Sequence, residues 1–320
     1  MSAARTLRNG RGRQRGAVLV LVLWILTLLT FLLGAFSSEI RVENRIVGDM
    51  VERIRLRAGA TAVLNYLALA GTASPEGLAG LEGWSLSLPL GKSSVDYRLV
   101  PEEAYVSLNA APPEMLEALL GNYPDGVDDV DALVNALVDW RDGDDVVTEN
   151  GAEAAEYASA GLAYGPRNAP LLSADELGLV LGFDQGLVDW LRPYVSVAST
   201  SAGIDARFAD PELVLMLDTE GRFSEQDLAA MQEDQAVADA MALESSFFAA
   251  TRSGAYRVLV QGSGGMGLKR HQAIEVIASF GGMVAPPQPG FGMLAVGPVL
   301  SPYRIIQWNE FPPLDVDGEH

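Results

Sequence analysis

The chain has 320 residues with 42 acidic and 22 basic side chains, and its formal net charge at pH 7 is −20. Such a field repels nucleic-acid phosphates and favours cations or basic partners. Apolar residues make up 49% of the chain, which excludes bulk disorder, and the absence of cysteine excludes a thiol nucleophile. The absence of cysteine does not decide the compartment.

The first forty residues have the pattern of a membrane anchor. An uncharged stretch from Gly16 to Ser38 has an apolar core, residues 17–36, of the length that a helix needs to cross about 30 Å of hydrocarbon. Five arginines precede it: Arg5, Arg8, Arg11, Arg13 and Arg15. The positive-inside rule predicts a single-pass inner-membrane protein with a cytoplasmic N-terminus and a periplasmic main domain. A plain signal anchor has the same pattern, whereas a cleaved secretory signal has a shorter apolar region.

A charged leader that ends at Gly16 allows a third interpretation. The segment resembles the class III leader of type IV pilins and pseudopilins, which a prepilin peptidase cuts on the cytoplasmic side. The resemblance implies a leader over residues 1–16, cleavage between Gly16 and Ala17, and N-methylation of Ala17. Most pilins carry glutamate at the fifth mature position, where this chain has Leu21. A subunit without that glutamate resembles minor pseudopilin K of type II secretion systems.

A long helix is predicted after the leader. Residues 39–70 contain no proline, and apolar residues recur among them at helical spacing. A helix over residues 17–70 would be about 80 Å long, with one half in lipid and the other packed on a globular domain. The alternative is a membrane helix that breaks near Gly48 and a separate helix after it.

The body of the chain shows strand signals early and late, with helix signals between them. Alternation predicts strands at 84–88, 95–100, 105–108, 256–260, 267–278 and 303–308. Helical patterns cover 112–120, 130–140, 152–159, 174–181, 185–191 and 223–244, and Ser173 with Glu176 forms a capping-box motif. Residues from Asp210 weakly repeat those from Pro112. This order predicts an α+β domain in two parts, 71–110 and 251–320, interrupted by a helical insertion over 111–250 with its core at 112–193.

An acidic loop is the strongest candidate for a metal site. Its oxygen-bearing side chains are Asp139, Asp142, Asp144, Asp145, Glu149, Asn150 and Glu153. Calcium takes six to eight oxygen ligands, and this stretch supplies them densely. The spacing is not that of an EF-hand, because the pattern fails at Val146. The alternative is a solvated acidic loop with an aspartate helix cap.

Further segments of the body carry the same resemblance in the same order. They are Leu108-Asn-Ala-Ala-Pro-Pro-Glu-Met-Leu116, Leu137-Val-Asp-Trp-Arg-Asp142, Glu149-Asn-Gly-Ala-Glu153, Pro166-Arg-Asn-Ala-Pro170, Leu191-Arg-Pro-Tyr-Val195 and Ile305-Ile-Gln-Trp-Asn-Glu310. They resemble minor pseudopilin K, so that with the leader nearly the whole chain is covered. The resemblance implies a pilin-like fold in which a long N-terminal transmembrane helix packs on an antiparallel sheet interrupted by a large helical domain. It also implies structural calcium in that domain, held first by Asp142, Asp144, Glu149 and Glu153, and then by Asp139, Asp145 and Asn150.

The function implied by the resemblance is that of a tip subunit. Such a subunit joins other minor pseudopilins and helps to initiate the pseudopilus that exports proteins across the outer membrane. Its other partners would be the major pseudopilin, the prepilin peptidase and inner-membrane lipid. A bulky insertion and Leu21 both suit a subunit with nothing stacked above it. The alternative is a signal-anchored periplasmic module that binds a cation or a basic ligand.

Nucleic-acid binding and catalysis have little support. The stretches 108–112 and 173–182 also resemble helix-hairpin-helix motifs of competence proteins, but acidic neighbours such as Asp175 and Asp184 disfavour phosphate. His271 stands alone in a predicted strand, and the glycine-rich stretch 262–267 lacks the G-x-S-x-G pattern. The sequence therefore predicts a protein that is not an enzyme and binds no nucleic acid.

Overall fold

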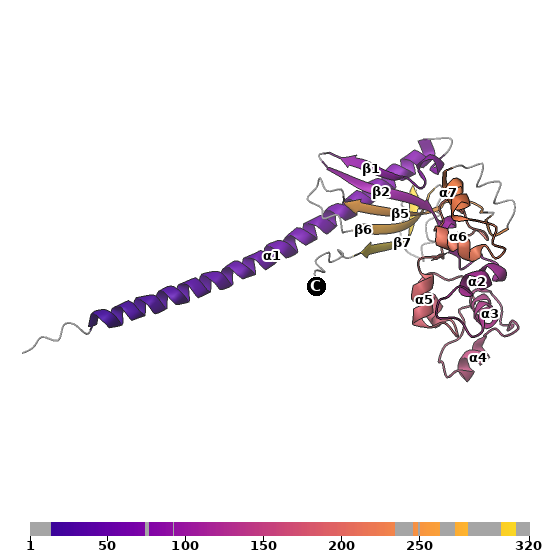
Figure 1. Cartoon of the computed structure of the whole chain (residues 1–320), viewed down its shortest axis with the longest axis horizontal. Coiled ribbons are helices and arrows are strands. Elements are labelled where there is room, and N and C mark those ends of the chain that lie inside the picture. Colours follow the sequence, from indigo (N-terminus) through magenta and orange to yellow (C-terminus); the bar gives the residue numbers. More distant parts are fainter. Residues whose placement is uncertain are drawn as a thin grey trace, which may run out of the picture. The chain divides into compact units, whose positions relative to one another are not determined.

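The computed structural model of the chain describes residues 14–73, 77–91, 93–233, 246–248, 250–262, 273–280 and 302–311. The chain forms two compact units, Met1–Arg55 and Leu56–His320 (Figure 1). The strands and all helices after the first belong to the second unit.

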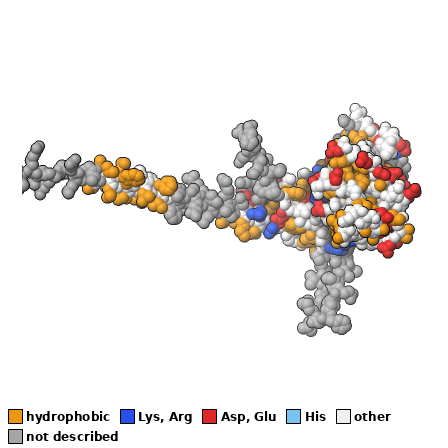
Figure 2. All heavy atoms as spheres, turned by 90° about the horizontal axis from the view of Figure 1, so that it is seen from below, with side chains coloured by type: hydrophobic (Ala, Val, Ile, Leu, Met, Phe, Trp, Pro, Cys, Tyr) orange, Lys and Arg blue, Asp and Glu red, His pale blue; other side chains and the backbone are white. Residues whose placement is uncertain are grey.

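The first element is one helix, α1 (Gln14–Ala73), of 60 residues. It continues through Gly48, so the alternative with a break at that residue is wrong. The described side chains of residues 18–32 are exposed and mostly apolar, as Figure 2 shows in orange. Among the described residues, no stretch of helix combines the length and the apolarity that crossing a membrane requires. Most of the predicted leader, residues 1–13, and the side chains of Gly16 and Ala17 lie outside the described part of the chain.

A five-stranded antiparallel sheet combines early and late parts of the sequence. Its strands are β1 (Ser85–Leu90), β2 (Ser93–Pro101), β5 (Ala255–Gly262), β6 (Ala273–Phe280) and β7 (Tyr303–Phe311), and they lie in the order β1-β2-β5-β6-β7. In β2, alternate residues Val95, Tyr97 and Leu99 are buried on one face. The predicted mixture of helix and antiparallel sheet is therefore confirmed.

The second half of α1 covers that face of the sheet. Its apolar stripe has helical spacing and packs against β2, β5 and β6 in one core: Leu56, Ala60, Val63, Leu64 and Leu67. Gly59 lets the helix approach closely, because a Cβ atom there would lie 2.6 Å from Cγ1 of Val95. Arg57 Nε lies 2.5 Å from Glu310 Oε1, which ties the helix to the outermost strand, β7.

The chain between β2 and β5, residues 102–254, is here named the helical region. Its α-helices are α2 (Pro113–Leu120), α3 (Val130–Arg141), α4 (Ala154–Ser159), α5 (Gln185–Leu191), α6 (Pro211–Leu217) and α7 (Glu225–Glu233), and the first four gather together in Figure 1. They enclose a second core that includes Met115, Leu137 and Leu177. The weak repeat yields two helices, α2 and α6, that each begin at a proline and contact each other, with Asn122 Nδ2 donating to the Met216 carbonyl at 3.2 Å.

Several elements differ from their predicted form. The strand expected at 105–108 is only β3 (Val106–Ser107), which pairs in parallel with β4 (Val195–Ser196) outside the main sheet. The helix expected at 174–181 is a 3-10 helix, η3 (Ala174–Leu179). Its capping box is not reciprocal: the Ser173 hydroxyl accepts from Asp175 N, while Glu176 accepts from Leu172 N and pairs with Arg167. The remainder of the helix predicted to reach residue 244 and of the strand predicted to begin at 267 lies outside the described residues.

Buried ion pairs join the helical region to the sheet. The fully buried Glu102, in η2 (Glu102–Ala104), accepts from Arg257 Nε of β5 at 3.0 Å and from the Ser196 hydroxyl of β4. The Arg257 guanidinium also lies 3.8 Å from the ring centre of Tyr105. Because a buried carboxylate is costly without a partner, these contacts fix the connection between the two parts.

Candidate functional site

The last turn of α3 places a carboxylate in the core of the helical region. Most of the buried positions of α3 are apolar, but Asp139 is 0% exposed. Both carboxylate oxygens of Asp139 accept from the Thr148 N–H, each at 3.2 Å. A single backbone N–H does not offset the free-energy cost of burying a charged carboxylate, so a positive charge near Asp139 would stabilise this site.

The acidic loop wraps closely around Asp139. Asn150 adopts a φ of 61°, and Gly151 N donates to the Thr148 carbonyl at 2.8 Å to close a tight turn. A Cβ atom at Gly151 would lie 2.2 Å from Asp139 Oδ2, so only glycine allows this approach. Asn135 Nδ2 holds the loop by donating to the Glu149 carbonyl at 2.9 Å.

Glu153, at the N-terminus of α4, is the least compensated carboxylate of the loop. Its side chain is nearly buried, with the residue 6% exposed, and within the described part of the chain neither of its carboxylate oxygens has a hydrogen-bond donor. Glu156 Oε2 instead accepts from the Glu153 backbone N–H at 3.0 Å. Burial raises the pKa of Glu153, and the negative charges of four aspartates raise it further: Asp139, Asp142, Asp145 and Asp144.

Asp142 has the same kind of environment. Among the described residues its Oδ1 atom is buried without a hydrogen-bond donor, and burial is the first cause that raises its pKa, with the charges of Asp144 and Asp139 adding to it. A hydrogen bond from the Asp144 backbone and the charge of the neighbouring Arg141 offset this rise in the pKa only in part. The Arg141 guanidinium donates to the carbonyls of Leu108 at 2.6 Å and Ala111 at 2.8 Å, and burial lowers its pKa.

A further oxygen comes from a residue that the sequence did not single out as a ligand. Asn168 adopts a φ of 51°, and its Nδ2 donates to the Asp144 carbonyl and to Asp145 Oδ1, each at 2.8 Å. The Oδ1 atom of Asn168 is buried without a donor. The available signal was its position between two prolines in the segment 166–170, which carried the family resemblance.

The structure therefore divides the predicted ligand set. Asp139 and Glu153 are buried and Asp142 is half-buried, whereas four members are exposed: Asp144, Asp145, Glu149 and Asn150. The charges of all four aspartates nevertheless act on Glu153. Among the residues that the structure describes, no three histidine, aspartate or glutamate side chains are already grouped as metal ligands. The described residues include buried oxygen atoms without a hydrogen-bond partner on Asp142, Glu153 and Asn168. Carboxylate and amide oxygens are ligands that fit a hard cation such as calcium.

The same part of the chain carries a match to a protein family. Residues 97–200, from β2 through the acidic loop to β4 and just beyond it, match the family model described as type II secretion system (T2SS), protein K. Over these residues the chain is similar to this protein K family. A curated relative, type II secretion system protein K of Pectobacterium carotovorum subsp. carotovorum, is 25% identical over an alignment of 217 residues that covers 60% of this chain. The match spans 65% of that relative's length.

A solved structure has a similar arrangement of helices and strands. It is a chain of the crystal structure of the GspK–GspI–GspJ complex from the type 2 secretion system of enterotoxigenic Escherichia coli. The TM-score is 0.52 at 16% sequence identity, over 82% of this chain and 96% of that one. At this identity the likeness concerns the arrangement of helices and sheet.

Proposed function

We propose that the chain is a minor pseudopilin that acts at the tip of a type II secretion pseudopilus and helps to initiate its assembly for export across the outer membrane. The observation that supports this most is the helical region between β2 and β5, of which residues 102–200 match the protein K family model. A helical region of this size would crowd a repeating shaft but fits at an end. The solved structure with the similar fold is that of a GspK–GspI–GspJ complex, so we propose other minor pseudopilins as partners here.

In this proposal α1 has two roles. Residues 17–36 form the single inner-membrane span, with the N-terminus in the cytoplasm and the second unit in the periplasm. The exposed apolar side chains there, such as Leu19 at 74% and Phe31 at 76%, support contact with lipid and with the helix of the major pseudopilin. The second half of α1 holds the sheet. The chain acts by assembly, and we assign it no catalytic role.

Leader processing tests the proposal. The full chain is expressed with and without a prepilin peptidase, and its intact mass and N-terminal sequence are measured. We expect a new N-terminus at Ala17, N-methylated, only when the peptidase is present. Gly16→Val should block cleavage, whereas Gly10→Val, in the same leader, should leave it intact. An unprocessed Met1 in both samples would reject the pseudopilin and favour the signal-anchored binding module.

We also propose structural calcium in the acidic loop. Asp139, Asp142, Asp144, Asp145 and Glu153 would hold it, with Glu149 and Asn150 closing from the exposed side and Asn168 adding an amide oxygen. The support is the set of buried oxygens without donors. The ion would supply positive charge where the coupled carboxylates otherwise repel one another.

Calorimetric titration of the full chain with calcium tests this part. Glu153→Gln should weaken calcium binding by about tenfold or more, because it removes a buried anionic ligand. Glu114→Gln, on the exposed side of α2, is the control and should leave the affinity unchanged. Equal affinities for wild type and Glu153→Gln would reject this ligand assignment.

A further inference from the structure

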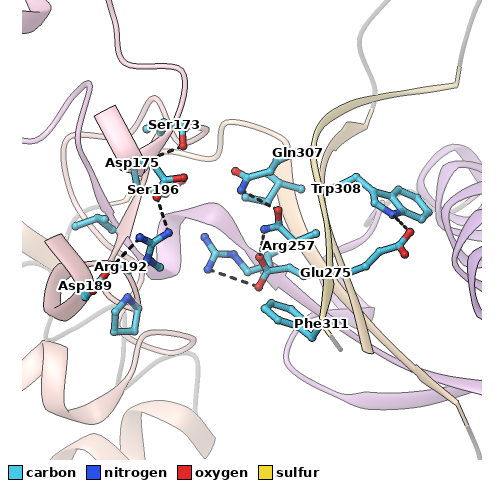
Figure 3. A pocket seen from close by; sticks show the side chains of 17 residues that line it. Ser173, Asp175, Asp189, Arg192, Ser196, Arg257, Glu275, Gln307, Trp308 and Phe311 are labelled. Atoms are coloured by element: carbon cyan, nitrogen blue, oxygen red, sulfur yellow. Dashed lines mark hydrogen bonds and ion pairs between the residues drawn. The ribbon is translucent and has the colours of Figure 1, made fainter. Parts of the chain in front are cut away.

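A cleft of about 690 Å³ lies between the helical region and the sheet. One wall comes from η3 and the end of α5 and carries Asp175, Asp189 and Arg192. The other wall comes from β5, β6 and β7 and carries Arg257 and Glu275. Figure 3 shows the two walls facing each other. Because its walls belong to two distant parts of the sequence, no motif indicates this cleft.

The outermost strand, β7, forms one side of the cleft and is an edge of the sheet. Among the described residues only β6 pairs with it. Its nine residues contain no proline, and its two charged residues, Arg304 and Glu310, stand near its ends. Three of its apolar side chains are exposed: Ile305 at 44%, Ile306 at 39% and Phe311 at 48%. Native proteins usually protect edge strands with charges, proline or a covering element. A long edge with exposed apolar side chains therefore indicates a docking edge.

The charges of the cleft indicate the kind of partner. Arg192 lies between Asp175 at 2.5 Å and Asp189 at 3.2 Å. Arg257 lies between Glu102 at 3.0 Å and Glu275 at 4.0 Å. The acidic residues that line the cleft are Asp175, Asp189, Glu275 and Glu310, and its basic residues are Arg192 and Arg257. The lining therefore carries a negative excess, and both of its arginines are engaged in ion pairs. Electrostatic complementarity favours a cationic occupant.

The cleft is also held in shape before anything binds. The Ser196 hydroxyl and Arg257 both contact the buried Glu102, which fastens the helical region to the sheet at the base of the cleft. On β7, Gln307 Nε2 donates to Asn309 Oδ1 at 3.2 Å, and Asn309 Nδ2 donates to Glu275 Oε1 of β6 at 3.1 Å. Fixed walls lower the ordering cost of binding.

We propose that β7 accepts an extended segment of a partner polypeptide as an added strand, whose basic side chains enter the cleft against Asp175, Asp189 and Glu275. In strand addition, main-chain hydrogen bonds provide affinity and alternate side chains provide specificity. Every second side chain of the incoming strand would face the cleft, so the basic residues recur at every second position. The site does not depend on leader processing or on calcium.

The test uses the purified full chain in detergent and a labelled peptide, about as long as β7, in which lysine alternates with valine. Fluorescence anisotropy measures its dissociation constant beside that of a glutamate–valine peptide, and we expect the lysine peptide to bind at least about tenfold more tightly. Two further lysine peptides carry N-methyl groups on one or the other set of alternate backbone amides. Only one set points at the neighbouring strand, so one methylated peptide should lose binding and the other keep it. Similar affinities of the two methylated peptides would overturn the proposal.

Protein variants separate the cleft from general attraction to an acidic protein. Asp175 and Asp189 have side chains 67% and 59% exposed, so replacing both by asparagine should leave the fold intact and weaken binding of the lysine peptide about tenfold. The matched control replaces Glu114 and Glu117, exposed on α2, by glutamine and should bind as wild type. Equal weakening in both double variants would overturn the proposal. Binding seen only after removal of residues 312–320 would also overturn it, because the chain's own tail would then occupy the edge.

Discussion

The contact between Gly151 and the buried Asp139 makes the acidic loop sensitive to a single methyl group. In Gly151→Ala the new Cβ atom would start 2.2 Å from Asp139 Oδ2, 2.9 Å from its Cγ and 3.1 Å from the Thr148 carbonyl oxygen. Asp139 is 0% exposed, so it has no free space into which to turn. Either the carboxylate or the loop backbone must move by roughly 1 Å.

The expected cost follows from the contacts that such a movement breaks. Overpacking of a buried site costs about 1–3 kcal/mol. Both Asp139 oxygens would also lose the Thr148 N–H, and a hydrogen bond to a charged group contributes about 1.5–3 kcal/mol. Since partial relaxation recovers some of this, we expect the local opening free energy of the loop to fall by about 2–4 kcal/mol.

Hydrogen–deuterium exchange of the full chain is the suitable assay, because it reports local opening rather than global unfolding. Amides of residues 139–157 should exchange about 30- to 1,000-fold faster in Gly151→Ala than in wild type. Gly143→Ala is the matched control, since it lies in the same loop and has nothing within 4 Å of the added methyl group. If the two variants exchange alike, the reasoning from the close approach is refuted.

Three other outcomes follow from the charges. Without calcium, Glu153→Gln should raise the free energy of unfolding by about 1–2 kcal/mol, because it removes a buried charge without a donor, and urea unfolding in a chelator checks this. Because burial raises the pKa of Glu153 in the folded state, the folded wild type takes up a proton at a higher pH than the unfolded chain does. Its stability deficit against the variant should therefore shrink as the pH falls through the folded-state pKa, and a deficit that stays constant down to about pH 4 contradicts this. Arg257→Met should lower the free energy of unfolding by about 3–5 kcal/mol, because it leaves the buried Glu102 without its cationic partner. Arg192→Met should lower it by at most about 1 kcal/mol, because the Arg192 side chain is 50% exposed. Equal losses of the two variants in urea unfolding would disprove this distinction.

Elements with local start and stop signals were predictable from the sequence. Helix α5 has the predicted bounds, and Asp184 caps it by accepting from Leu187 N at 2.8 Å. Strand alternation located β2 and β5 because each buries every second side chain against α1. These signals act within a few residues, so they are visible without knowledge of the fold.

Elements whose form depends on distant partners were predicted less well. The strand expected at 105–108 pairs only where Val106 N and Leu108 N donate to the carbonyls of Tyr194 and Ser196. Glu176 was expected to cap its own helix, but Arg167 and the Leu172 N–H engage its carboxylate instead. In both cases a tertiary contact decides between two locally acceptable conformations.

The candidate site shows the same limit. The sequence placed seven oxygen-bearing residues in one loop, and the structure leaves four of them exposed: Asp144, Asp145, Glu149 and Asn150. The charge of the half-buried Asp142 acts on the nearly buried Glu153. The sequence did not identify Asn168 as a ligand, because its hydrogen bonds to Asp144 and Asp145 exist only when the fold brings the loop at 166–170 beside them. Composition thus located the site, whereas the orientation of each side chain required the fold.

Two of the buried acidic groups of the second unit differ in how their charge is compensated. Glu102 has an arginine of β5 and a serine hydroxyl of β4, so its charge is neutralised within the chain and binds the helical region to the sheet. Glu153 has no hydrogen-bond donor among the described residues, and the nearby Arg141 donates to backbone carbonyls instead. An uncompensated buried carboxylate must either take up a proton or attract a cation from outside. The first group therefore serves the architecture, while the second makes the stability of the loop depend on its ionic surroundings.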